Sequence, residues 1–181
     1  MLFGTLAVIS SLPLLAFGAR FKRATPESFG LYAYGDGLGG IPLFYSGGFA
    51  YIGEPGKLNS TDAAVVQFSL GDDNSWIGSP NVTIPAGSNV TWSNATFFVP
   101  ADGASDTRVG FETGTTISDN VTATGFVFYG NNAMRTQDGQ LVSLWSALQV
   151  SDRVHALYWN DTSQGQQPVM LRSLPPSNPD N

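Results

Sequence analysis

The sequence contains no cysteine and only one histidine in 181 residues. Without cysteine the chain forms no disulfide, offers no thiolate to a metal and has no cysteine nucleophile. A single histidine also rules out any site that needs two imidazole groups. We therefore predict no catalytic residue, no metal-ligand set and no cofactor site from these residue types.

Charge is also scarce, and most of it is negative. Asp, Glu, Lys and Arg make up 12% of the chain, about half of the roughly 25% found in an average domain. With 8 basic and 14 acidic residues the net charge is −6, which disfavours nucleic acid because phosphate backbones select clusters of Lys and Arg. Hydrophobic residues make up 42%, enough for the core of one folded domain.

The one long uncharged apolar run occupies residues 1–18 and reads MLFGTLAVISSLPLLAFG. It is shorter than the about 20 residues of a membrane span, and Pro13 interrupts it. A secretory signal peptide fits better, although a positive residue is missing at its start; the alternative is a buried N-terminal helix. Ala16 and Gly18 are the small residues expected before a cut at Ala19. No other run predicts a transmembrane segment.

A short basic segment, residues 19–23, follows and ends in the pair Lys22-Arg23. A dibasic pair just after a signal peptide looks like the site of a kexin-type processing protease; the alternative is a basic flank without a role. Cleavage after Arg23 would leave residues 24–181 and remove three of the eight basic residues. We expect residues 19–23 to be a pro-segment and the mature chain to be more acidic than its precursor.

The strongest chemical signal is N-glycosylation. The acceptor pattern Asn-x-Ser/Thr occurs six times, each time with Thr in the third position. Strand-rich proteins favour Thr, but six matches exceed what composition explains. With the signal peptide they predict a eukaryotic secreted glycoprotein, whose glycans keep a surface with few charges soluble. The six acceptors are Asn59, Asn81, Asn89, Asn94, Asn120 and Asn160.

The body of the chain is typical of short β-strands. Apolar residues recur with a period of two, so that one face of each segment is apolar. A helical period fits only residues 141–150, which fit a strand equally well. The segments that predict strands are 28–34, 41–45, 49–52, 64–70, 90–99, 108–112, 121–129, 154–159 and 169–172.

Turn residues separate these segments. Asp-Gly pairs at 36–37, 102–103 and 138–139 suit the positive φ of tight hairpins, and Ser46-Gly47-Gly48 divides two aromatic runs. Many short strands joined by turns indicate an all-β fold: a single antiparallel β-sandwich, a jelly-roll-like domain or a small barrel. We expect one such domain over residues 24–174 and a flexible polar tail at 175–181.

Three patterns suggest chemistry that the rest of the sequence does not support. Residues 35–40 match G-x-G-x-x-G, but a strand instead of a helix follows, so a glycine-rich turn is the better interpretation. His155 has no G-x-S-x-G nucleophile to pair with, and a lone His on a strand face is usually structural. A glycosidase needs two carboxylates about 5 to 9.5 Å apart, which sequence alone does not exclude. The three glutamates are Glu27, Glu54 and Glu112.

The loop of Asp72, Asp73 and Asn74, followed by Trp76, is the most interesting candidate for a ligand. Clustered oxygen atoms can hold calcium, and an indole can stack on a sugar. The interpretation that we favour is a solvated turn that leads into a strand with a core Trp. Four tyrosines are ambiguous in the same way, either exposed for carbohydrate or part of the core: Tyr32, Tyr34, Tyr45 and Tyr51.

Six short segments also carry a resemblance. Near the start these are SFGLYAYG at 28–35, GIPLFY at 40–45 and GFAYIG at 48–53; later come SWIGSP at 75–80, RVGF at 108–111 and GFVFYG at 125–130. In motif order and style they resemble small secreted proteins of filamentous ascomycete fungi, across most of the mature chain. The resemblance implies a fungal extracellular or cell-wall setting and assigns no activity to any residue.

The sequence therefore predicts a secreted, N-glycosylated fungal protein of the extracellular space or cell wall, without catalytic machinery. A carbohydrate-binding, lectin-like module is the first alternative, and a carbohydrate-active hydrolase is the second. Cell-wall polysaccharide is the partner that this setting suggests. A binding module would show a strip of exposed aromatic rings, and a hydrolase would show carboxylates that converge in a cleft.

Overall fold

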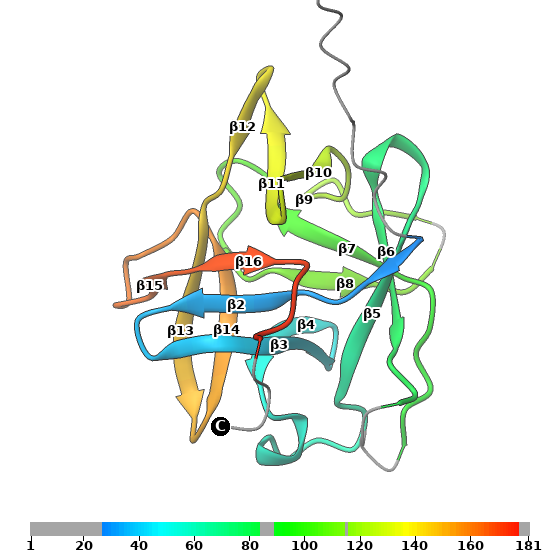
Figure 1. Cartoon of the computed structure of the whole chain (residues 1–181). Coiled ribbons are helices and arrows are strands. Elements are labelled where there is room, and N and C mark those ends of the chain that lie inside the picture. Colours follow the sequence, from blue (N-terminus) through cyan, green and yellow to red (C-terminus); the bar gives the residue numbers. More distant parts are fainter. Residues whose placement is uncertain (1–26, 84–88, 115, 178–181) are drawn as a thin grey trace, which may run out of the picture.

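The computed structural model describes residues 27–83, 89–114 and 116–177, and these residues are almost entirely β (Figure 1). Two short 3-10 turns, η1 (Pro55–Lys57) and η2 (Asp72–Asn74), interrupt the strands. The predicted all-β class is confirmed. The proposed signal peptide and pro-segment, and the end of the polar tail, lie outside the described residues.

Six antiparallel strands close into a barrel. Around the barrel the order is β3–β5–β6–β7–β8–β4, and β4 pairs again with β3 to complete the circle. Of the three architectures that the sequence left open, the small barrel with additional strands is therefore the observed one. The barrel strands are β3 (Leu38–Ser46), β4 (Phe49–Gly53), β5 (Ala64–Leu70), β6 (Trp76–Pro80), β7 (Ala95–Pro100) and β8 (Gly110–Glu112).

Two groups of strands extend the sheet beyond the barrel (Figure 1). One continues from β3 through β2, β16 and β11 to β10, with β12 also paired to β11; the other continues from β4 through β14 and β13 to β15. The short strands β1 and β9 pair with β5 and β7. The bounds are β1 (Ser28–Phe29), β2 (Tyr32–Gly35), β9 (Val121–Thr122), β10 (Phe126–Tyr129), β11 (Asn132–Gln137), β12 (Gln140–Val142), β13 (Trp145–Ser151), β14 (Val154–Trp159), β15 (Gln167–Pro168) and β16 (Met170–Arg172).

Three of the four predicted glycine turns join hairpin strands, whereas Asp102-Gly103 lies in the longer connection between β7 and β8. Gly47 and Gly48 have φ of 56° and 84° between β3 and β4, and Asp138 and Gly139 have φ of 50° and 76° between β11 and β12. Two consecutive residues with positive φ match the right-handed twist of the flanking strands. These residue pairs therefore set the register of both hairpins.

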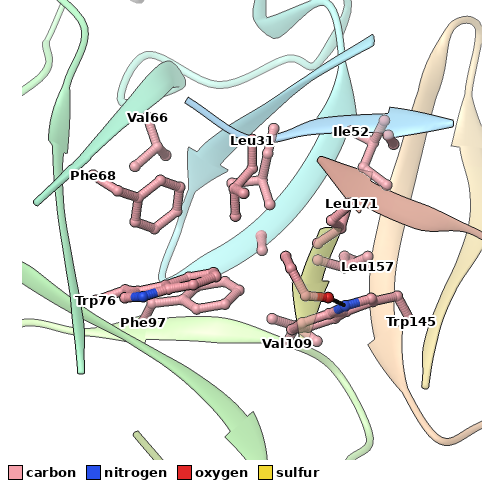
Figure 2. Close-up of a cluster of buried hydrophobic side chains, with 14 of the residues drawn as sticks. Leu31, Ile52, Val66, Phe68, Trp76, Phe97, Val109, Trp145, Leu157 and Leu171 are labelled. Atoms are coloured by element: carbon pink, nitrogen blue, oxygen red, sulfur yellow. Dashed lines mark hydrogen bonds between the residues drawn. The ribbon is translucent and has the colours of Figure 1, made fainter. Parts of the chain in front are cut away.

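The centre of the core is a cluster of aromatic rings. Trp76 is 0% exposed, and its indole lies 4.9 Å from the ring of Phe128 and 5.1 Å from that of Phe29. Phe68 and Phe97 pack edge to face at 5.4 Å, a geometry that aromatic quadrupoles favour. Figure 2 shows Trp76 and Phe97 side by side on one side of the core, with aliphatic side chains from the barrel and from both extensions on the other: Leu31 before β2, Ile52 on β4, Leu157 on β14 and Leu171 on β16.

Trp145 joins one extension to the other. Its indole N–H donates to the carbonyl oxygen of Ala133 on β11 at 2.8 Å (Figure 2), and its ring packs edge to face on Trp159 at 4.6 Å. A buried indole needs such a partner, because an unpaired N–H in an apolar core is costly. The two extensions therefore share one continuous core with the barrel.

Several predicted strands are shorter or broken. Residues 90–99 were predicted as one strand, but β7 begins only at Ala95. The chain before it is held to the connection that precedes β5, where the N–H of Asn89 donates to the carbonyl oxygen of Thr61 and the indole N–H of Trp92 donates to that of Asp62. Residues 121–129 split into β9 and β10 at Gly125, whose φ is 81°. Residues 28–34 split into β1 and β2, which pair with different strands. Residues 141–150 are strand, not helix.

Barrel closure requires a residue without a side chain at Gly110, which pairs with Phe49 where β8 meets β4. A Cβ on Gly110 would lie 2.5 Å from the carbonyl oxygen of Gly48 and 2.7 Å from the ring of Phe98. The first contact involves backbone, which moves only if the strands separate. Because Gly110 has no Cβ, β8 can approach β4 closely enough for the barrel to close.

We predict that Gly110→Ala lowers the free energy of unfolding by about 1 to 3 kcal/mol, because the added methyl overpacks the closure point. Gly39→Ala is the matched control, since Gly39 lies in β3 and a Cβ there meets no atom within 4 Å. The control should change stability by less than about 1 kcal/mol. Urea unfolding of both variants measures the difference, and equal stabilities would contradict the closure argument.

Candidate functional site

All six predicted glycan acceptors lie at the surface. Their side chains are exposed at five positions, and the sixth, Asn81, is half-buried. Asn94 and Asn160 have φ of 50° and 51°, a left-handed conformation that Asn tolerates better than most residues. The exposed acceptors are Asn59, Asn89, Asn94, Asn120 and Asn160. No acceptor would need the core to open for a glycan to be attached.

Four of these acceptors gather at the end of the β5–β6 hairpin where β5 begins and β6 ends. The N–H of Asn81 donates to the carbonyl oxygen of Val65 on β5 at 2.8 Å. The N–H of Asn94 donates to the hydroxyl of Ser79 on β6 at 3.2 Å. Both acceptors are thereby tied to the same hairpin end.

Asn59 and Asn89 join this group through the residues beside them. The N–H of Asn89 donates to the carbonyl oxygen of Thr61, two residues after Asn59, at 2.8 Å. The Trp92 indole N–H donates to the carbonyl oxygen of Asp62 at 2.9 Å. The connection before β5 and the one after β6 are therefore held together by direct hydrogen bonds.

The Asp62 carboxylate organises this end of the barrel. It accepts hydrogen bonds from the hydroxyls of Ser46 and Ser60 and from the N–H of Gly47 at 3.0 Å. Partial burial raises the pKa of Asp62, but these hydrogen bonds together outweigh burial and hold its pKa below the usual value. The β3–β4 turn is thus anchored to the segment that carries Asn59.

The structure separates the two parts of the proposed calcium and sugar site. Asp72, Asp73 and Asn74 are exposed in η2, whereas the Trp76 ring points into the core. The interpretation of Trp76 as a sugar platform is wrong, because a ring packed on all sides by other aromatic rings offers no face to a ligand. Its interpretation as a core residue is confirmed. The described residues contain no group of three or more His, Asp or Glu side chains arranged to hold a metal ion.

The four ambiguous tyrosines do not form an exposed strip. Tyr45 is a core residue, and the hydroxyl of Tyr34 donates to the carbonyl oxygen of Leu174 at 3.1 Å. Tyr129 on β10 is 69% exposed, and it is the one aromatic side chain among the exposed large hydrophobic residues of the described ranges. The half-buried tyrosines are Tyr32, Tyr34 and Tyr51.

The glycine motif and the histidine are structural elements. Asp36 and Gly37 form the turn between β2 and β3, and the rest of residues 35–40 lies in these two strands, as the interpretation of a glycine-rich turn predicted. His155 lies on β14 opposite Ile52 and Gln149, and burial lowers its pKa. Its Nδ1 atom is buried and has no hydrogen-bond partner among the described residues. No catalytic triad is built around it there.

The glutamates lie apart in different local interactions. Glu54 forms an ion pair with Arg153 at 2.8 Å, and the carboxylate of Glu112 accepts the N–H of Ser118 at 3.0 Å. Glu27 is exposed at the beginning of the described residues. Neither pairing resembles two carboxylates facing each other across a glycosidic bond.

An open depression of about 460 Å³ lies between the segment before β8 and the loop after β14. Its two walls are residues 105–108 and the side chains of Tyr158, Asn160, Asp161, Ser163 and Gln164. Backbone hydrogen bonds join the walls: the N–H of Trp159 donates to Thr107 at 3.0 Å, and that of Val109 donates to Leu157 at 2.9 Å. The two walls of the depression are therefore joined by backbone hydrogen bonds at the end of β14.

Asp161 holds the loop side of this depression. Its carboxylate accepts hydrogen bonds from the hydroxyl of Thr107 at 2.6 Å, the N–H of Ser163 at 2.8 Å and the amide of Gln166 at 3.2 Å. The hydroxyl of Ser146 donates to its backbone carbonyl at 2.6 Å. The Thr107 hydroxyl, followed by Ser163, lowers the pKa of Asp161, so the side chain stays a carboxylate.

Arg108 supplies the positive charge of the opposite wall. Its guanidinium carbon lies 3.8 Å from the ring centroid of Phe49 and 5.1 Å from that of Tyr51, a cation–π arrangement. Its Nε and Nη2 atoms are buried without a hydrogen-bond partner in the described structure. Its backbone N–H donates to the carboxylate of Asp106 at 2.9 Å.

This set of groups suits binding better than hydrolysis. A glycosidase needs a carboxylic acid with a raised pKa, whereas the pKa of Asp161 is lowered. One guanidinium and two carboxylates, surrounded by hydroxyl and amide groups, favour a neutral polar ligand over an anion. Sequence reasoning missed Arg108 and Asp161 because they are far apart in the chain. The sequence signals near them were the Asn160 acceptor motif and the RVGF segment at 108–111, and neither pointed to a shared site.

Comparisons of the chain with protein-family models, curated proteins and solved structures found no match. Within the described ranges, no helix has the length and apolar character needed to cross a membrane. Function therefore has to be inferred from the chemistry of this chain's own residues.

We predict that Trp76→Ala lowers the free energy of unfolding by about 3 to 5 kcal/mol, because it leaves a cavity among the aromatic rings. Asp73→Asn should change it by less than about 0.5 kcal/mol, since Asn tolerates the φ of 52° at this exposed position. Thermal melts with and without calcium measure both effects. A calcium-dependent rise in the melting temperature that Asp73→Asn abolishes would restore the calcium interpretation.

We also predict that Asp62 makes stability depend on pH. Because its folded pKa lies below the ordinary value of 3.8, its contribution is present above pH 3.8 and is lost as the pH falls through the lowered pKa. Asp62→Asn should cost about 1 kcal/mol at pH 7 and almost nothing near pH 2. Asp138→Asn, at an exposed turn, is the control. Urea unfolding from pH 2 to 7 tests this, and a pH-independent loss would contradict it.

Proposed function

We propose that this chain is a secreted, N-glycosylated protein of the fungal extracellular space or cell surface that acts without catalysis. The observation that supports this most directly is the surface position of all six glycan acceptors. All six also lie in connections between strands, so a glycan can be attached at each of them without disrupting a β-ladder. Glycans at these positions would cover a surface that has few charges to keep it soluble.

The proposed processing at Lys22-Arg23 is compatible with the fold. The described residues begin at Glu27, and the first strand, β1, begins at Ser28. A cut after Arg23 would therefore leave every described strand intact. Removal of three basic residues would also increase the excess of acidic residues in the mature protein.

A lectin-like module is the second candidate, and the polar depression beside β14 favours it more than any aromatic strip does. Neutral polar lining groups and a nearby tyrosine are suitable for sugar hydroxyls. A carbohydrate-active hydrolase has less support, because the carboxylate of Asp161 is stabilised in its charged form. Cell-wall polysaccharide remains the partner that this setting suggests.

We predict that protein secreted by a filamentous fungal host begins at Ala24 and carries N-linked glycans on at least three of the six acceptors. Enzymatic deglycosylation converts an occupied Asn to Asp, so peptide mass spectrometry identifies both the sites and the N-terminus. Protein made in bacteria supplies the unmodified control peptides. Conversion at fewer than three sites, or a mature chain that retains residues 2–18, would contradict the proposal.

A further inference from the structure

The depression beside β14 has a glycan acceptor at its edge. Asn160 lines it directly, and the acceptor's threonine, Thr162, is exposed two residues later. The N–H of Asn160 donates to the carbonyl oxygen of Leu144 at 2.8 Å, and its φ is 51°. The backbone that presents this acceptor is therefore held in one conformation at the edge of a concave surface.

The loop that carries the acceptor is also held in place. Asp161, the middle residue of the acceptor motif, bonds to Thr107 across the depression and to Ser163 and Gln166 in its own loop. These bonds involve a charged acceptor, which makes them stronger than neutral hydrogen bonds. A sugar attached to the side chain of Asn160 would therefore start from a fixed point.

The lining matches the chemistry of a neutral sugar. Hydroxyl and amide groups of Ser105, Ser163 and Gln164 can donate to and accept from sugar hydroxyls. The volume, about 460 Å³, falls within the roughly 300 to 1,000 Å³ of small-molecule sites. Two carboxylates and one guanidinium disfavour an anionic occupant.

We infer that this depression binds the first sugars of the glycan attached to Asn160. In eukaryotic N-glycans these sugars are N-acetylglucosamine, a neutral residue with hydroxyl and acetamido groups. Attachment at the edge gives the sugar a millimolar effective concentration, so weak contacts suffice to keep it seated. The inference rests on the proposed function, since it requires that Asn160 is glycosylated.

The first test is the rate of enzymatic deglycosylation of the native protein, followed site by site with mass spectrometry. The glycan at Asn160 should be released about tenfold more slowly than that at Asn89, because a seated sugar is withheld from the enzyme. The double variant Ser105→Ala/Gln164→Ala keeps the acceptor motif and should remove the difference. Both side chains are exposed and make no hydrogen bond of their own within the described residues.

The second test separates the attached sugar from a free one. Thr162→Ala removes the glycan, and Thr162→Ser retains it as the matched control. Free N,N′-diacetylchitobiose should shift the amide NMR signals of Ser163 and Gln164 in the Thr162→Ala protein only. Shifts in the glycosylated protein would mean that the depression serves a free carbohydrate, and shifts in neither protein would mean that it holds no sugar; both results overturn the inference.

Failure of this inference is distinguishable from failure of the proposed function. If Asn160 is unoccupied while at least three other acceptors carry glycans, the inference of a sugar bound in the depression is wrong, but the proposal of a secreted glycoprotein is still supported. Equal release rates at Asn160 and Asn89, or slow release that persists in Ser105→Ala/Gln164→Ala, would also contradict binding of the glycan in the depression and would leave the proposed function unaffected. If no acceptor is occupied in protein from the fungal host, both proposals fail.

Discussion

Closure of six strands around a core of aromatic rings is the constraint on which the rest of the structure depends. The chain has no disulfide to hold its strands, so burial of apolar surface has to do so. Trp76 lies at the centre, in contact with rings from the barrel and from β10. Both strand extensions add side chains to the same core and position the loops at their ends.

The closed barrel also explains why the two ends of the β5–β6 hairpin differ. At one end Asp62 binds the β3–β4 turn and the neighbouring connections with hydrogen bonds, and four glycan acceptors lie around it. At the other end the exposed turn of η2 leads directly into the buried Trp76. A sugar coat would thus be concentrated on one end of the barrel, supported by a local polar network.

The polar depression has a different origin, because it lies where β14 ends and the segment before β8 passes beside it. Its walls are segments about fifty residues apart that pair through single backbone bridges and through the bond between Thr107 and Asp161. Loops held by a rigid sheet commonly carry binding residues. The ring of Phe49 stabilises the positive charge of Arg108 by a cation–π interaction, and Arg108 forms no ion pair within the described structure.

The sequence by itself determined the all-β class, the glycine turns, the acceptor motifs and most strand positions, because these depend on local periodicity and local φ preferences. It also favoured a core position for Trp76, since a large apolar residue directly after a polar turn commonly begins a strand, and the structure confirms this position. The breaks near Trp92 and Gly125 escaped prediction because they depend on distant residues: the Trp92 side chain donates to the carbonyl oxygen of Asp62, and the N–H of Gly125 donates to that of Asp73. Only the tertiary structure closed the barrel and brought Arg108 beside Asp161, because strand order depends on contacts between distant parts of the chain.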